Sequence, residues 1–259
     1  MRVWPLGVPV LLACALALPC AAAAGVVRVF GPGGPAPAMK AAAVAFEKLH
    51  PGVSVQVTAG PTPRWIAAAR AEGDVIYSGS EAMMAEFEHD LAGVLDPTTI
   101  EPLYLRPAVI LVRPGNPDQI TGVDDLLKPG VRVMVVNGAG QVGLWEDIVG
   151  RDGDIATVRD FRRNIVYAAP NSALALKRWR DDPSVQAWLI YNIWAIAHPG
   201  VADIVPLEPR YRLYRDCGAG LTARGRASAE ARAFVAFLHG ARGQAIFAHW
   251  GWQQQLRAP

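Results

Sequence analysis

The chain has 259 residues, of which 52% are hydrophobic and 19% are charged, and its formal net charge is +2. This balance allows a sizeable buried core and excludes an intrinsically disordered chain. The basic residues are scattered among acids, so the composition indicates neither nucleic acid nor an anionic membrane as a partner.

The first 24 residues differ in composition from the rest. Arg2 provides a positive start, residues 8–18 form an apolar stretch, and residues 21–23 are alanines suited to cleavage. This pattern predicts a secretory signal peptide over residues 1–24 and therefore a periplasmic protein. The apolar stretch is shorter than the ~20 residues that a membrane helix needs, so we expect no direct membrane insertion.

Two consequences follow from cleavage after the predicted signal peptide. Only Arg2 is charged in the removed segment, so the net charge falls to about +1. Cys217 remains as the single cysteine, which indicates a core without a disulfide framework.

Residues 11–14 resemble a lipobox but lie too early in the leader, and a lipid anchor stays an open alternative.

Short β-branched runs alternate with alanine-rich helical stretches in the first part of the mature chain. The helical stretch from Met39 ends at Pro51-Gly52, a combination that stops helices. The order strand, helix, strand, helix, strand predicts a βαβαβ unit. Its elements are residues 26–30, 39–50, 53–58, 65–72 and 74–77.

A second series repeats this layout after an apolar run at residues 103–112, which we expect to cross between two lobes. Its elements are residues 131–136, 144–148, 155–163, 165–168, 172–180 and the apolar run 187–194. Residues 211–222 would make the return crossing, Ser228 would cap the next helix, and the last helix would pack back onto the first lobe.

The fold class predicted from this organisation is α/β, with two lobes that contain mainly parallel sheets and are joined by a two-segment hinge. The predicted domains are the signal peptide 1–24, a discontinuous lobe 1 of residues 25–105 plus 218–259, and lobe 2 of residues 106–217.

The turns that follow the predicted strands are rich in small, neutral hydrogen-bond donors. Ligands bind beyond the carboxyl ends of strands in open parallel sheets, and such donors suit an oxyanion. Any strand-to-helix turn also favours Gly, Ser and Asn, but their recurrence in both halves favours a shared binding crevice. The turns are residues 31–34, 60–63, 78–81, 137–141 and 171–172.

Residues 138–143 form a literal G-x-G-x-x-G after a predicted strand, which alone would indicate a dinucleotide. The fingerprint also requires an acid at the end of the next strand, where this chain has Tyr167-Ala168-Ala169-Pro170. We therefore interpret these glycines as part of an anion site at a helix N-terminus. No cofactor is expected.

Arginines and tryptophans could add to such a site. Arg64 follows Thr62 and could counter a carboxylate or phosphate, or lie in solvent. Arg106 could reach the crevice or brace the hinge through an acid such as Asp216. Most of the tryptophans are expected to fill the core.

Catalytic and metal-binding patterns are scarce. The five histidines are dispersed, without H-E-x-x-H or C-x-x-C, so no metal site is predicted. No Ser, His and acid set can be assembled with any specificity. We therefore expect a protein that is not an enzyme.

Several blocks resemble the accessory colonization factor C family, which belongs with the type II periplasmic solute-binding proteins, near the molybdate and sulfate receptors. They are FGPGGP at 30–35, TAGPTPRW at 58–65, YSGSE at 77–81, EPLYLRPAVILVRPGNP at 101–117, VNGAGQVGLWED at 136–147 and WLIYNIW at 188–194. The resemblance spans residues 26–252 and implies a type II periplasmic-binding-protein fold with its ligand between the lobes.

The candidate ligand-binding residues combine the turns with this resemblance. The resemblance implies Ser78, Ser80, Gly140, Gln141, Asn171, Ser172 and Asn192, and the turns add Gly33, Gly34, Thr62, Arg64 and Gly79.

The expected function is capture of a small anion, such as an inorganic oxyanion, a carboxylate or a phosphorylated metabolite, for ABC-type transport. The expected partners are the anion and an ABC permease, with a homodimer left open. Two alternatives remain: an envelope adhesin or sensor on the same fold, and an anion-ester hydrolase.

Overall fold

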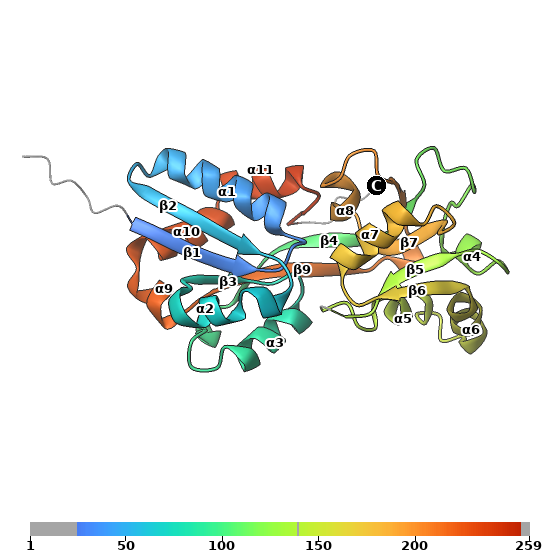
Figure 1. The fold of residues 1–259 in the computed structure, drawn as a ribbon, viewed down its shortest axis with the longest axis horizontal. Coiled ribbons are helices and arrows are strands. Elements are labelled where there is room, and N and C mark those ends of the chain that lie inside the picture. Colours follow the sequence, from blue (N-terminus) through green and yellow to red (C-terminus); the bar gives the residue numbers. More distant parts are fainter. Residues whose placement is uncertain (1–24, 139, 255–259) are drawn as a thin grey trace, which may run out of the picture.

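The computed structural model describes residues 25–138 and 140–254. It is a mixed α/β structure of two lobes connected by two long strands (Figure 1). The predicted signal peptide, residues 1–24, lies outside the described residues. No helix within the described residues is both long and apolar enough to cross a membrane.

The first lobe is built on three parallel strands, as the βαβαβ pattern predicted. β1 pairs with β2 on one side and with β3 on the other. Helices α1, α10 and α11 lie on one side of these strands and α2 and α3 on the other (Figure 1). The elements are β1 Gly25–Gly31, α1 Ala36–Leu49, β2 Val53–Ala59, η1 Thr62–Arg64, α2 Ile66–Glu72, β3 Val75–Tyr77, α3 Glu81–Asp90 and η2 Pro97–Thr99, with α9 Ala223–Ala227, α10 Ala229–His239 and α11 Ala241–His249 from the end of the chain.

The second lobe repeats the parallel pattern, with β5 between β6 and β7. The apolar run at 187–194 divides into a strand and a short helix at Asn192. The elements are α4 Val123–Leu126, β5 Val133–Val136, α5 Leu144–Val149, α6 Ile155–Asn164, β6 Ile165–Ala169, α7 Ser172–Asp181, β7 Ala187–Tyr191, α8 Ile193–Ile196, β8 Asp203–Pro206 and η3 Pro209–Tyr211.

Two antiparallel strands connect the lobes, β4 (Glu101–Val112) and β9 (Tyr214–Leu221). They join both sheets into one strand order, β2-β1-β3-β9-β4-β7-β5-β6, with β8 also paired to β4. The two-lobed fold with a two-segment hinge is therefore confirmed, whereas the exact lobe boundaries along these strands stay a prediction.

The sequence did not predict α3. Its N-cap is Ser80, whose side chain accepts a hydrogen bond from the amide of Met83 at 3.2 Å. Its apolar residues Met83, Met84 and Phe87 are buried, but charged residues surround them in the sequence and obscure the helical period.

The last helix packs back against the first lobe, as predicted. α11 contacts α1 and α10, and the ring of Phe247 stacks on Tyr104 of β4 with centroids 4.5 Å apart. After α11 the chain reaches the crossing strands, where Gln253 forms an antiparallel bridge with Leu105.

Phe46 joins α1 to α10 in the core of the first lobe. Its side chain is fully buried, and its ring makes edge contacts with Phe234 and Phe237 at 5.3 and 5.6 Å between centroids. We expect Phe46→Ala to lower the free energy of unfolding by ~3–5 kcal/mol, because truncation removes buried area and leaves a cavity. Urea denaturation would measure this loss.

The matched control is Val44→Ala on the outer face of the same helix, since Val44 is 52% exposed. It should change the free energy of unfolding by about 0.5 kcal/mol or less. Equal losses in the two variants would contradict the assigned burial.

Candidate functional site

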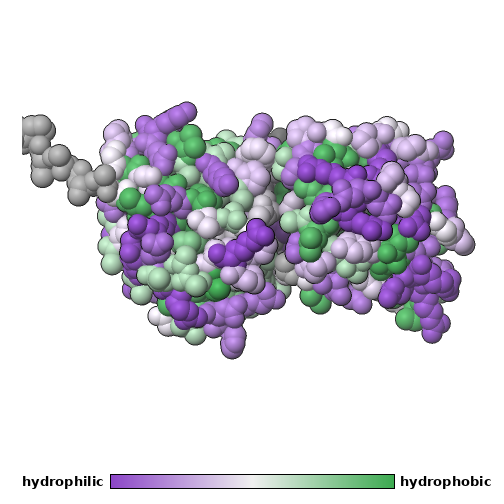
Figure 2. All heavy atoms as spheres, viewed as in Figure 1, coloured by the Kyte–Doolittle hydropathy of each residue, from purple (hydrophilic) through white to green (hydrophobic). Residues whose placement is uncertain are grey.

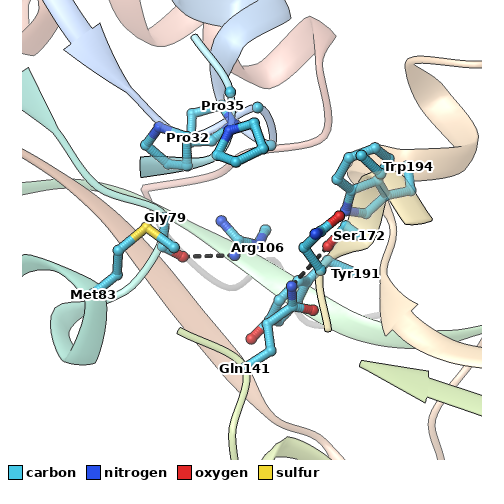
Figure 3. A pocket seen from close by; sticks show the side chains of 15 residues that line it. Pro32, Pro35, Gly79, Met83, Arg106, Gln141, Ser172, Tyr191 and Trp194 are labelled. Carbon is cyan, nitrogen blue, oxygen red and sulfur yellow. Dashed lines mark hydrogen bonds between the residues drawn. The ribbon is translucent and has the colours of Figure 1, made fainter. Parts of the chain in front are cut away.

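A cavity of about 100 Å³ lies between the lobes. Turns of the first lobe, turns of the second lobe and the crossing strand β4 line it (Figure 3). Its lining residues are Pro32, Gly33, Gly34, Pro35, Gly60, Pro61, Gly79, Met83, Arg106, Gln141, Asn171, Ser172, Ala173, Tyr191 and Trp194.

The first lobe contributes the turns that follow β1 and β3. Tyr77 holds the first turn in place, because its hydroxyl donates to the carbonyl oxygen of Pro32 at 3.0 Å. Ser78 fixes the second turn to β9 by accepting from the amide of Gly218 at 3.2 Å. The backbone of Gly33, Gly34 and Gly79 is thereby brought to the cavity wall.

The second lobe contributes an amide and a hydroxyl that bond to each other. Gln141 Nε2 donates to Ser172 Oγ at 2.7 Å, and both side chains are buried. Asn171 caps α7 by accepting from the amide of Leu174 at 3.0 Å. Gln141 Oε1 is buried without a hydrogen-bond partner among the described residues.

Arg106 places a positive charge at the centre of the site. It is 4% exposed and lines the cavity, and its Nη2 donates to the carbonyl oxygen of Gly79 at 2.6 Å. Its Cζ lies 3.8 Å from the ring centroid of Tyr191 and 4.6 Å from that of Trp252. Burial lowers the pKa of this guanidinium from its usual value.

Arg106 forms no direct ion pair within the described residues, although the charge of Asp216 acts against the effect of burial and raises its pKa. Its Nε and Nη1 are buried without hydrogen-bond partners there. Asp216, the acid suggested by the sequence, accepts a hydrogen bond from the amide of Glu81 at 3.0 Å. A buried, unpaired guanidinium with free N–H groups is suited to receive an anion.

The lobes touch each other beside the cavity. Ser80 Oγ, in the first lobe, donates to the carbonyl oxygen of Gly140, in the second lobe, at 3.2 Å. Gly140 has a φ of +72°, and a Cβ there would lie 2.9 Å from both Met83 Cβ and Ser80 Oγ. Only glycine fits this position without pushing the lobes apart.

The structure brings together only part of the candidate set. The cavity is lined by Gly33, Gly34, Gly79, Gln141, Asn171 and Ser172. Ser78, Ser80 and Gly140 lie beside it and bond to protein atoms instead. Ligand contact by any of these residues stays a prediction.

Thr62, Arg64 and Asn192 do not line the cavity. The side chain of Trp65 is buried and donates from Nε1 to the carbonyl oxygen of Gly60 at 3.1 Å, so the 3₁₀ turn before it directs Arg64 outward, where it is exposed. Asn192 donates from Nδ2 to the carbonyl oxygen of Gly251 at 2.8 Å.

Sequence reasoning left Arg106 undecided and omitted Met83 and Tyr191 from the site. One signal was available, because Arg106 is a charged residue inside a long apolar run. Of the tryptophans, Trp65 and Trp188 are buried as expected, whereas Trp194 lines the cavity.

The geometry does not suit a dinucleotide or a metal. Sites for drug-sized ligands occupy ~300–1,000 Å³, and this cavity has about 100 Å³. Across residues 25–138 and 140–254, no three or more His, Cys, Asp or Glu side chains are arranged to hold a metal ion.

Residues 27–253 match the family described as bacterial extracellular solute-binding protein. The structure resembles Peb3 from Campylobacter jejuni at 33% identity, covering 88% of this chain and 100% of that chain, with a TM-score of 0.82. L-phospholactate-bound PEB3 gives 34% identity, the same coverage and a TM-score of 0.83. No curated protein matches the sequence.

More distant structures share the fold. The sulfate-binding protein SubI from Mycobacterium tuberculosis H37Rv has 17% identity over 88% of this chain and 86% of that chain, with a TM-score of 0.68. The periplasmic molybdate-binding protein of Azotobacter vinelandii has 17% identity over 89% of this chain and 100% of that chain, with a TM-score of 0.65.

The contact at Gly140 makes closure of the lobes testable. We expect Gly140→Ala to favour an open form by roughly 5- to 150-fold, because overpacking a tight contact costs ~1–3 kcal/mol. Small-angle X-ray scattering should then show a larger radius of gyration than for the unchanged protein.

Gly143→Ala is the matched control. Gly143 has a similar φ of +78°, but the nearest atom to its added Cβ is Glu146 Oε2 at 3.8 Å. It carries the same backbone strain without the contact across the cleft, so equal radii for the two variants would argue against closure through Gly140.

Proposed function

The chain belongs to the family of bacterial extracellular solute-binding proteins, and from that we propose that it is a periplasmic receptor that captures a small anion between its lobes for an ABC-type permease. The anion enters while the lobes are apart, and closure about β4 and β9 traps it. The receptor leaves its ligand chemically unchanged.

Arg106 is the observation that carries this proposal. A buried charge without a partner is unfavourable in a low-dielectric interior, and an anion that accepts from its free N–H groups removes that penalty. Such charge-assisted hydrogen bonds are shorter and stronger than neutral ones. The guanidinium thus supplies both affinity and selection for negative charge.

Helix N-termini add to the positive potential of the cavity. Gly33 and Gly34 precede α1, Gly79 precedes the cap of α3, and Asn171 caps α7. Each of these residues lines the cavity. The unpaired amides and the positive end of the helix dipole favour an anion at such ends.

The neutral side chains would complete the solvation of the anion. The side chains of Gln141 and Ser172 come from the second lobe, and the first lobe offers the backbone of Gly79. Donors from both lobes can replace the water around an anion only after closure, which couples binding to closure.

The names of similar proteins support an anionic ligand. The structures of PEB3 with L-phospholactate, of a sulfate-binding protein and of a molybdate-binding protein all concern negatively charged solutes. These ligands differ in shape and size, so we propose the anionic class without choosing among them.

The lining residues favour binding over hydrolysis. Among the described residues at the cavity, none is a His, Cys, Asp or Glu that could act as a general base. The hydroxyl of Ser172 accepts from Gln141, which has no basic nitrogen to activate it. We therefore propose a receptor and not an anion-ester hydrolase.

Thermal shift measurements with sulfate, molybdate, phosphate, citrate, phosphoglycerate and L-phospholactate test this function. A binding anion at 100 times its Kd should stabilise the protein by ~2.7 kcal/mol and raise its Tm by several degrees. Arg106→Gln should weaken binding of that anion by roughly 10- to 150-fold, because a hydrogen bond to a charged group contributes ~1.5–3 kcal/mol.

Arg64→Gln is the control, since it removes an exposed arginine outside the cavity. It should leave the anion-induced shift as it is in the unchanged protein. The proposal fails if no anion of the panel raises the Tm, or if Arg106→Gln and Arg64→Gln respond alike.

A further inference from the structure

The segment after α11 connects to both lobes. We define residues 251–254 as the C-terminal strap. The carbonyl oxygen of Gly251 accepts from Asn192 Nδ2, in the second lobe, at 2.8 Å. Gln253 exchanges two backbone hydrogen bonds with Leu105 on the first-lobe side of β4, each at 2.8 Å.

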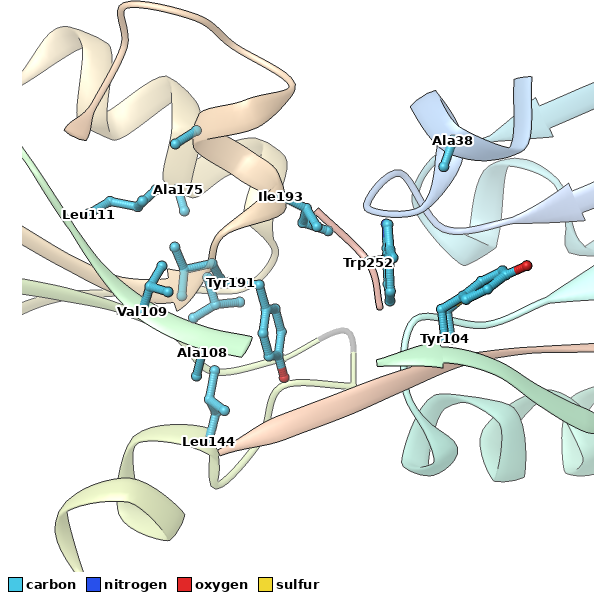
Figure 4. Close-up of a cluster of buried hydrophobic side chains, with 14 of the residues drawn as sticks. Ala38, Tyr104, Ala108, Val109, Leu111, Leu144, Ala175, Tyr191, Ile193 and Trp252 are labelled. Carbon is cyan, nitrogen blue, oxygen red and sulfur yellow. The ribbon is translucent and has the colours of Figure 1, made fainter. Parts of the chain in front are cut away.

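Trp252 is the buried residue of the strap. It is 1% exposed, and its ring lies 4.6 Å from Arg106 Cζ. In Figure 4 its side chain lies between Ile193 of the second lobe and Tyr104 of the first, with Tyr191 close by. Two rings from separate parts of the chain, Trp252 and Tyr191, therefore contact the guanidinium.

These contacts fix the orientation of Arg106. Tyr191 comes from β7 in the second lobe, Trp252 from the strap, and the carbonyl oxygen of Gly79 from the first lobe. A planar guanidinium held against aromatic rings keeps its remaining N–H groups in a defined plane. Their direction therefore depends on the strap.

The strap docks on the second lobe through a glycine. Gly251 has a φ of +86°, and a Cβ at this position would lie 2.4 Å from Ile196 Cδ1 and 2.7 Å from Asn192 Nδ2. A side chain at 251 would have to displace Ile196 Cδ1 and Asn192 Nδ2, and Nδ2 is the atom that donates to the carbonyl oxygen of Gly251.

We propose that the C-terminal strap is a third link between the lobes and that Trp252 is a positioning residue for Arg106. Docking of Gly251 on Asn192 and orientation of the guanidinium are then parts of one closed arrangement. The positioning role rests on the proposed anion-binding function, whereas the link between the lobes does not.

The link is tested first by scattering without any ligand. Gly251→Ala should give a larger radius of gyration than Gly200→Ala. Gly200 has a similar φ of +77° and nothing within 4 Å of an added Cβ, so it reproduces the backbone strain without the clash. Equal radii for the two variants would overturn the strap as a link, whatever the anion result.

The positioning role is tested by isothermal titration with L-phospholactate, sulfate and phosphate. Trp252→Leu should weaken whichever of these anions binds by about tenfold, as expected for loss of a desolvated cation–π contact. Trp252→Phe keeps an aromatic ring and should restore most of the affinity. If Trp252 only stabilised the fold, anion affinity would not depend on whether residue 252 carries an aromatic ring.

Trp250→Leu provides the matched control, because Trp250 follows α11, is partly exposed and lines a surface groove between α1 and α11 instead of the cavity. It should leave affinity unchanged. If an anion binds the unchanged protein and binds Trp252→Leu equally well, the positioning role alone is overturned. Absence of binding to the unchanged protein would overturn both that role and the proposed anion-binding function, while the scattering result would still decide the link.

Discussion

The buried guanidinium of Arg106 is the constraint on which the rest of the site depends. A cation removed from water without a carboxylate partner is an energetic liability of several kcal/mol. The structure reduces it with a carbonyl oxygen and two aromatic faces, which are partial and neutral forms of compensation. Asp216 acts on this charge without forming an ion pair, which leaves the free N–H groups of Arg106 to an external anion.

The topology explains why Arg106 can reach the cavity walls that both lobes contribute. β4 passes from one sheet to the other, and Arg106 lies on it beside β9. The turns after parallel strands in each lobe meet at the same cavity, so their helix N-termini surround a charge that belongs to the hinge (Figures 1 and 3). In Figure 2, polar and apolar residues are interspersed over both lobes, and a furrow separates the two lobes.

Local patterns in the sequence predicted the alternating strands and helices of both halves, because these have recognisable periods and stop signals, and the family resemblance added the two-lobed arrangement. They also located turns that do reach the cavity, such as those containing Gly79 and Gln141. They did not reveal which charge the turns surround. That depends on the pairing of β4 with β9 and on the return of Trp252 from the end of the chain, which are long-range contacts without a local signature. The sequence left Arg64 open between the crevice and solvent, and the burial of Trp65 is the non-local feature that turns it outward.

Aromatic rings at the cavity have an optical consequence. Trp194 forms part of the wall, and Trp252 lies against the cation that would receive the anion. Indole emission responds to the electric field and to nearby quenching groups, so occupancy of the site would alter the light emitted by these two residues. The protein would then carry its own fluorescent reporter of whether it is loaded.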